Sequence, residues 1–143
     1  MPGYTLEHMM FSVFLVGFLI VTGNFAVQYA GAQVQVTLRV DLKNVVLYVK
    51  QELLDTYRAV DATGSAGFTV PVAVPRTIQG SRYTILLFAN GTLRGIVQQA
   101  TFDTQLPSLT NCAWSSSIFR SGGEAVRITG RYASGTVTVS ISP

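Results

Sequence analysis

The sequence predicts an α+β protein in which a long N-terminal α-helix precedes a small antiparallel β-sandwich. Two observations lead to this prediction. Residues 9–38 contain no Asp, Glu, Lys or Arg, and residues 66–143 consist of short runs of alternating apolar and polar side chains separated by turn residues. The first pattern is typical of a helix buried on all sides or in a membrane, and the second of strands. The chain therefore divides into a hydrophobic assembly or membrane helix, residues 1–62, and a β-sandwich domain, residues 66–143.

The uncharged run continues into an amphipathic segment. Residues 34–42, taken alone, alternate like a strand, but the wider spacing of three and four residues predicts one helical stripe. Thr63-Gly64-Ser65-Ala66-Gly67 then ends the helix. We expect a single helix from residue 4 to residue 62, roughly 85–90 Å long. The stripe consists of Val34, Leu38, Leu42, Val45, Val49, Leu53, Tyr57 and Val60.

Three interpretations of the apolar part of this helix remain open. It could be a cleaved secretory signal peptide, since Ala30-Gly31-Ala32 resembles a cleavage site, although residues 1–8 supply no Lys or Arg. It could be a permanent membrane anchor, with Gln28, Gln33 and Gln35 beyond the span. It could also cross the membrane first and later be buried among copies of itself.

Six strands are expected in the second part of the chain, which contains no lysine and only two acidic residues, Asp103 and Glu124. Pro71 and Pro75 place the first strand at a sheet edge, and Asn90-Gly91 predicts a type I′ hairpin turn. Six short strands in such a segment favour a small sandwich of the immunoglobulin-like kind. The expected strands cover residues 67–74, 82–89, 92–102, 113–120, 124–132 and 136–142.

Composition argues against several classes of function. Charged residues make up 12% of the chain, and a net charge of +3 is too small to indicate nucleic-acid binding. Cys112 is the single cysteine, which excludes an intrachain disulfide and favours an inert, buried thiol. His8 is the single histidine, and no residue set fits a catalytic triad, a metal site or a phosphate-binding loop. We therefore expect no enzyme activity and no cofactor.

One residue, one motif and one group of residues are candidate functional positions. Glu7 stands at the edge of the uncharged run, where it could complement the helix N-terminus or pair with the amine of a neighbouring subunit. Asn90-Gly91-Thr92 fits the N-glycosylation pattern and equally fits a structural hairpin turn. The helix core is expected to pack between neighbouring helices through Phe11, Phe14, Leu15, Phe18, Leu19, Phe25 and Tyr29.

The sequence GYTLE at residues 3–7, followed by MMFSVFLVGFLIVTG, an amphipathic half and a Ser/Thr-rich β domain, resembles the type IV pilin superfamily. The resemblance is closest to archaeal type IV-like pilins and archaellins. Bacterial pilins carry a motif like GFTLIE with the glutamate fifth in the mature chain, whereas cleavage after Gly3 would make Glu7 the fourth residue here. The basic residues of the usual leader are also absent before Gly3.

The resemblance implies a structural subunit of an extracellular helical filament, with helices bundled in its core and β domains outside, for adhesion or motility in an archaeal cell. It further implies a prepilin peptidase, an assembly ATPase and a membrane platform protein as partners, membrane insertion before assembly, and no nucleic acid. The alternative is a single-pass, membrane-anchored surface β-domain protein, either a minor pilin or a binding module.

Overall fold

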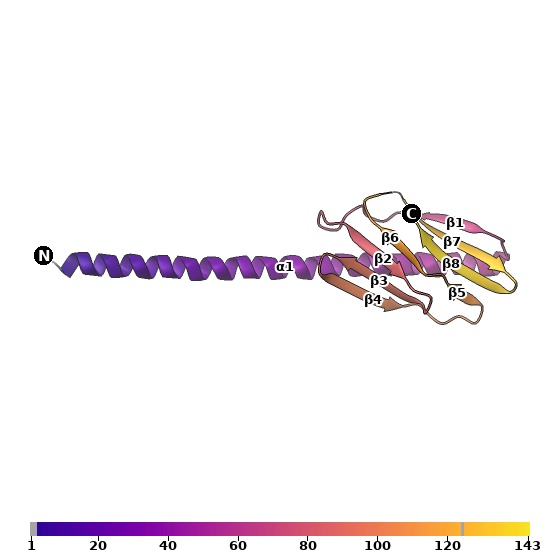
Figure 1. The fold of residues 1–143 in the computed structure, drawn as a ribbon, viewed down its shortest axis with the longest axis horizontal. Helices are drawn as coiled ribbons and strands as arrows, with labels where there is room; N and C mark the ends of the chain where they lie inside the picture. Colours follow the sequence, from indigo (N-terminus) through magenta and orange to yellow (C-terminus); the bar gives the residue numbers. More distant parts are fainter. Residues whose placement is uncertain (1–2, 124) are drawn as a thin grey trace. The chain divides into compact units, whose positions relative to one another are not determined.

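The computed structural model describes residues 3–123 and 125–143, with side chains from residue 7 onward. One helix, α1 (Gly3–Thr63), precedes all the strands (Figure 1). The strands are β1 (Phe68–Val72), β2 (Tyr83–Leu87), β3 (Thr92–Val97), β4 (Ala100–Gln105), β5 (Cys112–Trp114), β6 (Ser117–Arg120), β7 (Val126–Ala133) and β8 (Thr136–Ser142). The α+β class and the single long helix are confirmed.

The chain forms two compact units, Met1–Val36 and Thr37–Pro143. The first unit contains the uncharged part of α1. The second contains the rest of the helix together with every strand, so the amphipathic half of α1 belongs to the same folded body as the sheets.

The strands form two small, mostly antiparallel sheets, a β-sandwich-like arrangement. One sheet has the order β1-β7-β8-β5 and the other the order β4-β3-β2-β6. The expected edge position of the first strand is confirmed, because β1 pairs only with β7. The β5–β8 pair is parallel, which the expectation of a wholly antiparallel sandwich did not include.

Two predicted strands are each divided in the structure. Residues 92–102 form β3 and the start of β4, separated by a hairpin turn in which Gln98 has a φ of 51°. Glutamine is rarely found at positive φ, so the sequence carries no turn signal there. Residues 113–120 contain β5 and β6, which pair in different sheets on either side of Ser115 and Ser116.

The expected type I′ turn at Asn90-Gly91 is wrong. Phe88 accepts a hydrogen bond from the Gly91 amide at 2.9 Å and donates its own amide to Thr92 at 2.9 Å, which makes a three-residue loop with positive φ at Gly91 alone. This is the pattern of a type I turn followed by a glycine bulge. The two-residue loop with both residues at positive φ occurs instead at Ser134-Gly135, between β7 and β8.

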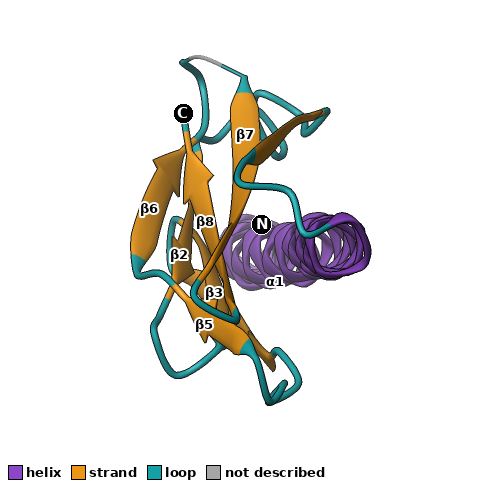
Figure 2. Ribbon diagram, turned by 90° about the vertical axis from the view of Figure 1, so that its right-hand side faces the viewer, coloured by secondary structure: helices purple, strands orange, loops and turns teal. Residues whose placement is uncertain are grey.

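The core of the second unit lies between α1 and the inner faces of both sheets. In Figure 2, viewed along α1, the strands lie on one side of the helix. The predicted stripe is buried from Leu38 to Val60, with Tyr57 partly buried, whereas Val34 is exposed because it falls in the first unit. The strands contribute alternate residues to this core, among them Tyr83, Ile85, Leu87, Leu93, Val97, Val126, Ile128, Val137, Val139 and Ile141.

Glycine in each sheet permits α1 to approach closely. A Cβ atom added at Gly95 of β3 would overlap the Val46 side chain and lie 2.9 Å from Leu42 Cδ1. A Cβ atom added at Gly130 of β7 would lie 2.7 Å from Val60 Cγ2. The two glycines belong to different sheets, so the helix is held closely against both.

Replacing Gly95 by Ala is expected to destabilise the second unit by about 1–3 kcal/mol, because the added methyl group overpacks the core against branched side chains. Thermal unfolding followed by circular dichroism measures the loss. Gly67→Ala is the matched control, since nothing lies within 4 Å of a Cβ atom at that position. Equal unfolding temperatures for the two variants would contradict the close approach described here.

Candidate assembly surface on α1

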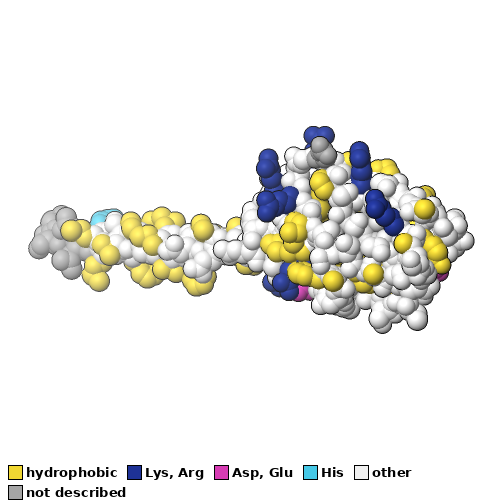
Figure 3. Space-filling view, turned by 45° about the vertical axis from the view of Figure 1, so that its right-hand side comes forward, with side chains coloured by type: hydrophobic (Ala, Val, Ile, Leu, Met, Phe, Trp, Pro, Cys, Tyr) yellow, Lys and Arg dark blue, Asp and Glu magenta, His cyan; other side chains and the backbone are white. Residues whose placement is uncertain are grey.

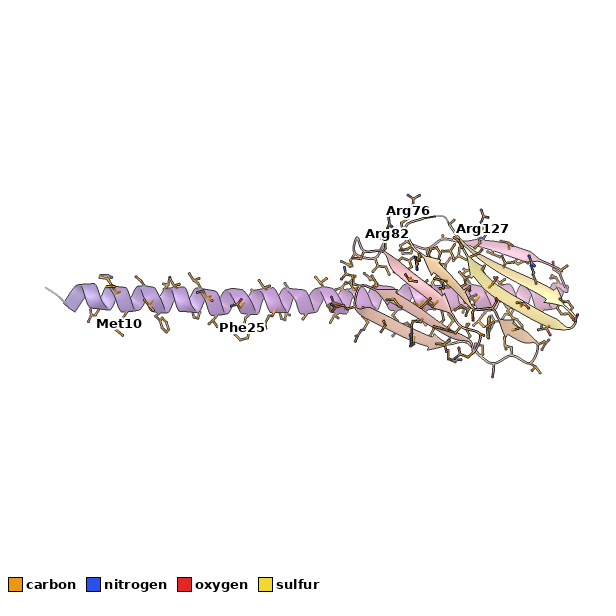
Figure 4. All side chains as sticks on the ribbon, in the orientation of Figure 1. Met10, Phe25, Arg76, Arg82 and Arg127 are labelled. Carbon is orange, nitrogen blue, oxygen red and sulfur yellow. The ribbon has the colours of Figure 1, made fainter. Side chains whose placement is uncertain are left out.

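The N-terminal half of α1 exposes large apolar side chains around its whole circumference. Figure 3 shows hydrophobic atoms along this part of the helix, and in Figure 4 Met10 and Phe25 both point away from its axis. A helix that is apolar on every side is stable only in a membrane or inside a larger assembly. The exposed residues include Met9, Met10, Phe11, Val13, Phe14, Val16, Phe18, Leu19, Ile20, Val21, Phe25, Val27 and Tyr29.

The candidate residues from the sequence fall on one face of this helix. Phe11, Phe18 and Phe25 are spaced by seven residues, which returns the chain to nearly the same side after two turns. Phe11 is 64% exposed and Phe25 68% exposed, so neither has a packing partner within the chain that would cover it. Phe14, Leu15, Leu19 and Tyr29 flank the same line and are likewise exposed.

Polar groups in the uncharged segment are bonded within the helix itself. The Thr22 hydroxyl donates to the Phe18 carbonyl at 2.8 Å, and Gln33 Nε2 donates to the Tyr29 hydroxyl at 3.1 Å. Internal bonding of this kind lowers the cost of transferring a polar side chain into an apolar environment. By length and composition α1 is also able to cross a membrane, and its most apolar window has no residue buried within the chain.

Glu7 is exposed and lies one helical turn before Phe11. Its predicted partner is the N-terminal amine of a neighbouring subunit, and that pairing remains a prediction. The structure does place the carboxylate on the same face as the aromatic side chains, since residues four apart are neighbours on a helix.

A second apolar line on α1 was not recognised in the sequence. Val40 is 50% exposed, Leu47 is 39% exposed and Leu54 is partly buried. These residues are seven apart. Val40 and Leu47 lie on the side of the helix away from the buried Leu42 and Val49, whereas Leu54 packs against the core. The spacing of seven residues between these apolar positions could have indicated the line from the sequence. It was not recognised because the longer apolar stripe that faces the sheets dominates the pattern.

Asn90 occupies an exposed hairpin tip, as both interpretations of the motif required. Its side-chain oxygen accepts a hydrogen bond from the Thr92 amide at 3.0 Å, and its carbonyl accepts one from Gln105 Nε2 at 2.7 Å. The loop is therefore ordered by its own polar groups, and Asn90 is accessible from solvent.

Cys112 is half-buried, less completely than the sequence indicated. Burial raises the pKa of its thiol to about 11, so the thiolate is scarce at neutral pH. Within residues 3–123 and 125–143, no group of three or more His, Cys, Asp or Glu side chains is placed to hold a metal ion.

Comparisons of the chain with protein-family models, with curated proteins and with solved structures find no match. The candidate surface therefore rests on the helix geometry alone.

Proposed function

We propose that this chain is a structural subunit of an extracellular, helical, type IV-like filament in which the helices are bundled in the core and the β domains lie outside. The observation that carries the proposal is the fully exposed apolar circumference of the N-terminal half of α1. Burial contributes about 25 cal/mol per Å² of apolar surface, so more than a dozen exposed large side chains provide a strong drive to associate.

The second apolar line supports polymerisation over simple anchoring. A bilayer span needs about 20 residues. Exposed apolar residues continue beyond that length through Val36 and Val40 to Leu47, on the side of α1 that no strand covers. A solitary anchor has no use for an apolar line beside its own folded domain, whereas a helix packed among copies uses both faces.

In this proposal the subunit is first held in the membrane by α1, after cleavage by a prepilin peptidase. An assembly ATPase and a membrane platform protein then transfer it into the filament. Thr22 and Gln33, which are bonded within the helix, can be buried in either environment. The filament would serve adhesion or motility at the surface of an archaeal cell.

The alternative is a single-pass membrane protein whose β domain binds a partner at the cell surface, as a minor pilin or a binding module. The length and composition of α1 suffice to cross a membrane. This property fits the alternative as well as it fits the first stage of filament assembly. The two functions differ in what happens once lipid or detergent is removed.

Full-length protein purified in detergent is expected to form filaments of helical symmetry when the detergent is removed, as seen by negative-stain electron microscopy. Phe18→Glu should abolish them, because the substitution places a charge in the apolar helix bundle. Ile118→Glu is the matched control, since Ile118 is 57% exposed on β6. A monodisperse, detergent-dependent monomer of the unmodified chain would favour the anchored binding module instead.

Glu7→Gln is expected to lower filament yield while leaving the unfolding temperature of the second unit unchanged. The reason is that a carboxylate paired with an amine in an apolar core fixes the position of one subunit against the next. Filament mass per cell or per milligram of protein measures the effect. Wild-type yield in this variant would leave Glu7 only the role of complementing the helix N-terminus.

Asn90 is expected to carry a glycan in the natural filament, because the acceptor motif lies at an exposed loop tip. Intact-mass analysis of sheared filaments should show added mass that disappears in Asn90→Gln. A mass equal to that of the bare polypeptide would remove this part of the proposal and leave the hairpin turn as the function of the motif.

A further inference from the structure

The strands and loops of the second unit carry more positive than negative side chains. Residues 66–143 contain six arginines and two acidic residues, Asp103 and Glu124. Asp103 is occupied by Arg94, which donates to its two carboxylate oxygens at 2.8 and 2.7 Å. Glu124 lies outside the described residues. The other arginines therefore give the solvent-facing side of the strands a positive charge.

Three of these arginines, Arg76, Arg82 and Arg127, lie on one side of the second unit and point away from the strands (Figure 4). Figure 3 shows positively charged side chains gathered on this side of the strands. All three arginines are exposed, and none forms a hydrogen bond or ion pair with any residue that the structure describes. Like charges gathered on one side of a domain raise the local potential and attract anions.

A cavity of about 190 Å³ opens beside two of these arginines. Residues 72–76 contribute one wall, which ends at Arg76. Arg82 reaches the opposite wall, because a Cβ atom added at Gly122 would lie 3.0 Å from the Arg82 Nε. Arg127 directly follows the last residue of that wall. The opposite wall consists of Gly122, Gly123, Ala125 and Val126, and Phe119 also lines the cavity.

Tyr83, a buried side chain, holds the two walls in place. Its hydroxyl donates to the Pro75 carbonyl at 2.6 Å, and its backbone amide donates to Ser121 Oγ, next to Gly122, at 2.7 Å. The Ser121 amide donates in return to the Tyr83 carbonyl at 2.9 Å. Burial raises the pKa of Tyr83 to about 12, so the hydroxyl stays protonated and remains a donor at neutral pH. The cavity is therefore formed by the fold itself.

The arginines and the cavity together suit an anionic group that is attached to a small ring. A guanidinium group presents its donors in a planar fork that matches a carboxylate. The cavity is smaller than the roughly 300 Å³ at which pockets for drug-sized ligands begin, so it admits one sugar-sized unit. Its Val, Pro and Phe side chains suit the C–H faces of a sugar ring. A chain of such sugars could continue from the cavity to Arg127.

Other polyanions fit this surface less well. Proteins that bind single-stranded nucleic acids stack bases on aromatic rings, whereas Phe119, the aromatic residue of this cavity, is 3% exposed. Basic surfaces that bind membranes also carry large apolar side chains that enter the lipid. The exposed positions of the two walls are instead Ala, Gly, Pro and Arg.

We propose that the cavity between residues 72–76 and Gly122 binds one sugar of a carboxylated polysaccharide, with Arg76 and Arg82 on its carboxylate and Arg127 on the next sugar of the chain. The site lies wholly within the second unit, so it goes beyond the proposed filament and does not require one. In a filament the same site would recur on every subunit.

Binding is measured on the full-length subunit in detergent, so that the result does not depend on filament formation. The probes are short oligomers of galacturonate and of mannuronate, with neutral dextran as the control ligand, followed by microscale thermophoresis. We expect saturable binding of at least one uronate oligomer, which weakens with added salt because the arginines are exposed. Absence of binding by both uronates at low salt, or equal affinity for dextran, would overturn the proposal.

Arg76→Ala and Arg82→Ala should each raise the dissociation constant for the uronate several-fold, since each removes a guanidinium group from the edge of the cavity. Arg131→Ala is the matched control. Arg131 is exposed on the same strand as Arg127, four residues and about 13 Å further along β7. An equal loss of affinity in Arg131→Ala would mean that net charge alone attracts the oligomer, and would overturn the site.

Ala125→Leu tests the cavity separately from its charge. The larger side chain occupies the space for the sugar, so affinity should fall several-fold although every arginine remains. Ala73→Leu repeats the test from the other wall, and Ala113→Leu, at an exposed position on β5, is the control. Circular dichroism identifies the variants that keep the unfolding temperature of the unmodified chain. Unchanged affinity in such a cavity variant would overturn the binding of a sugar there.

Competition distinguishes the sugar from other anions. A thymidine oligonucleotide and glycerol phosphate, the soluble headgroup of an anionic lipid, are each added at the same concentration of charge as the bound uronate oligomer. We expect neither to displace more than a small part of it. Full displacement by either competitor would assign the cavity to a nucleic acid or to a lipid headgroup, and would overturn the polysaccharide.

Discussion

The close packing of α1 against both sheets is the interaction on which the rest of the structure depends. Gly95 and Gly130 present no side chain to the helix, so Leu42, Val46 and Val60 lie close against the inner faces of the strands. Without the helix, the inner apolar residues of both sheets would lose part of their cover. The same packing fixes which side of α1 remains exposed, and therefore which residues are free to meet another molecule.

The two halves of α1 differ in how their apolar side chains are distributed around the helix. The N-terminal half is apolar on all sides and has no tertiary partner, whereas the C-terminal half has one buried side and one exposed side. Continuity of α1 across both halves means that a force applied to one is transmitted through an unbroken hydrogen-bonded backbone. The second unit therefore has a buried core of its own, whereas the first exposes its apolar side chains.

Much of the architecture could be predicted from the sequence, because the clearest sequence patterns are those that determine which side chains are buried. The absence of charge in residues 9–38 and the stripe from Leu38 to Val60 correctly predicted the helix and its buried side. The turn at Gln98 could not be predicted, since nothing about glutamine favours positive φ and the hairpin register imposes it. The change of sheet between β5 and β6 could not be predicted for a similar reason, because pairing with distant strands, and not local sequence preference, divides that segment.

For the candidate assembly surface, the exposure of residues from Phe11 to Tyr29 follows from the absence of charge in residues 9–38. The exposed line through Val40 and Leu47 became recognisable only when the structure showed that the opposite side of the helix is covered.

The position of β8 has a consequence for the order in which the chain can fold. This strand lies between β7 and β5 inside its sheet, although it comes late in the sequence. Its residues Val137, Val139 and Ile141 share one core with the helix residues from Leu38 to Val60, and contacts between segments so far apart in the sequence are slow to form. During synthesis the part of α1 near Val60, which Gly130 of β7 approaches, therefore stays uncovered for longer than the part near Leu42, which Gly95 of β3 approaches. Under the proposed function, the membrane that holds the first half of the helix would anchor its second half through this interval.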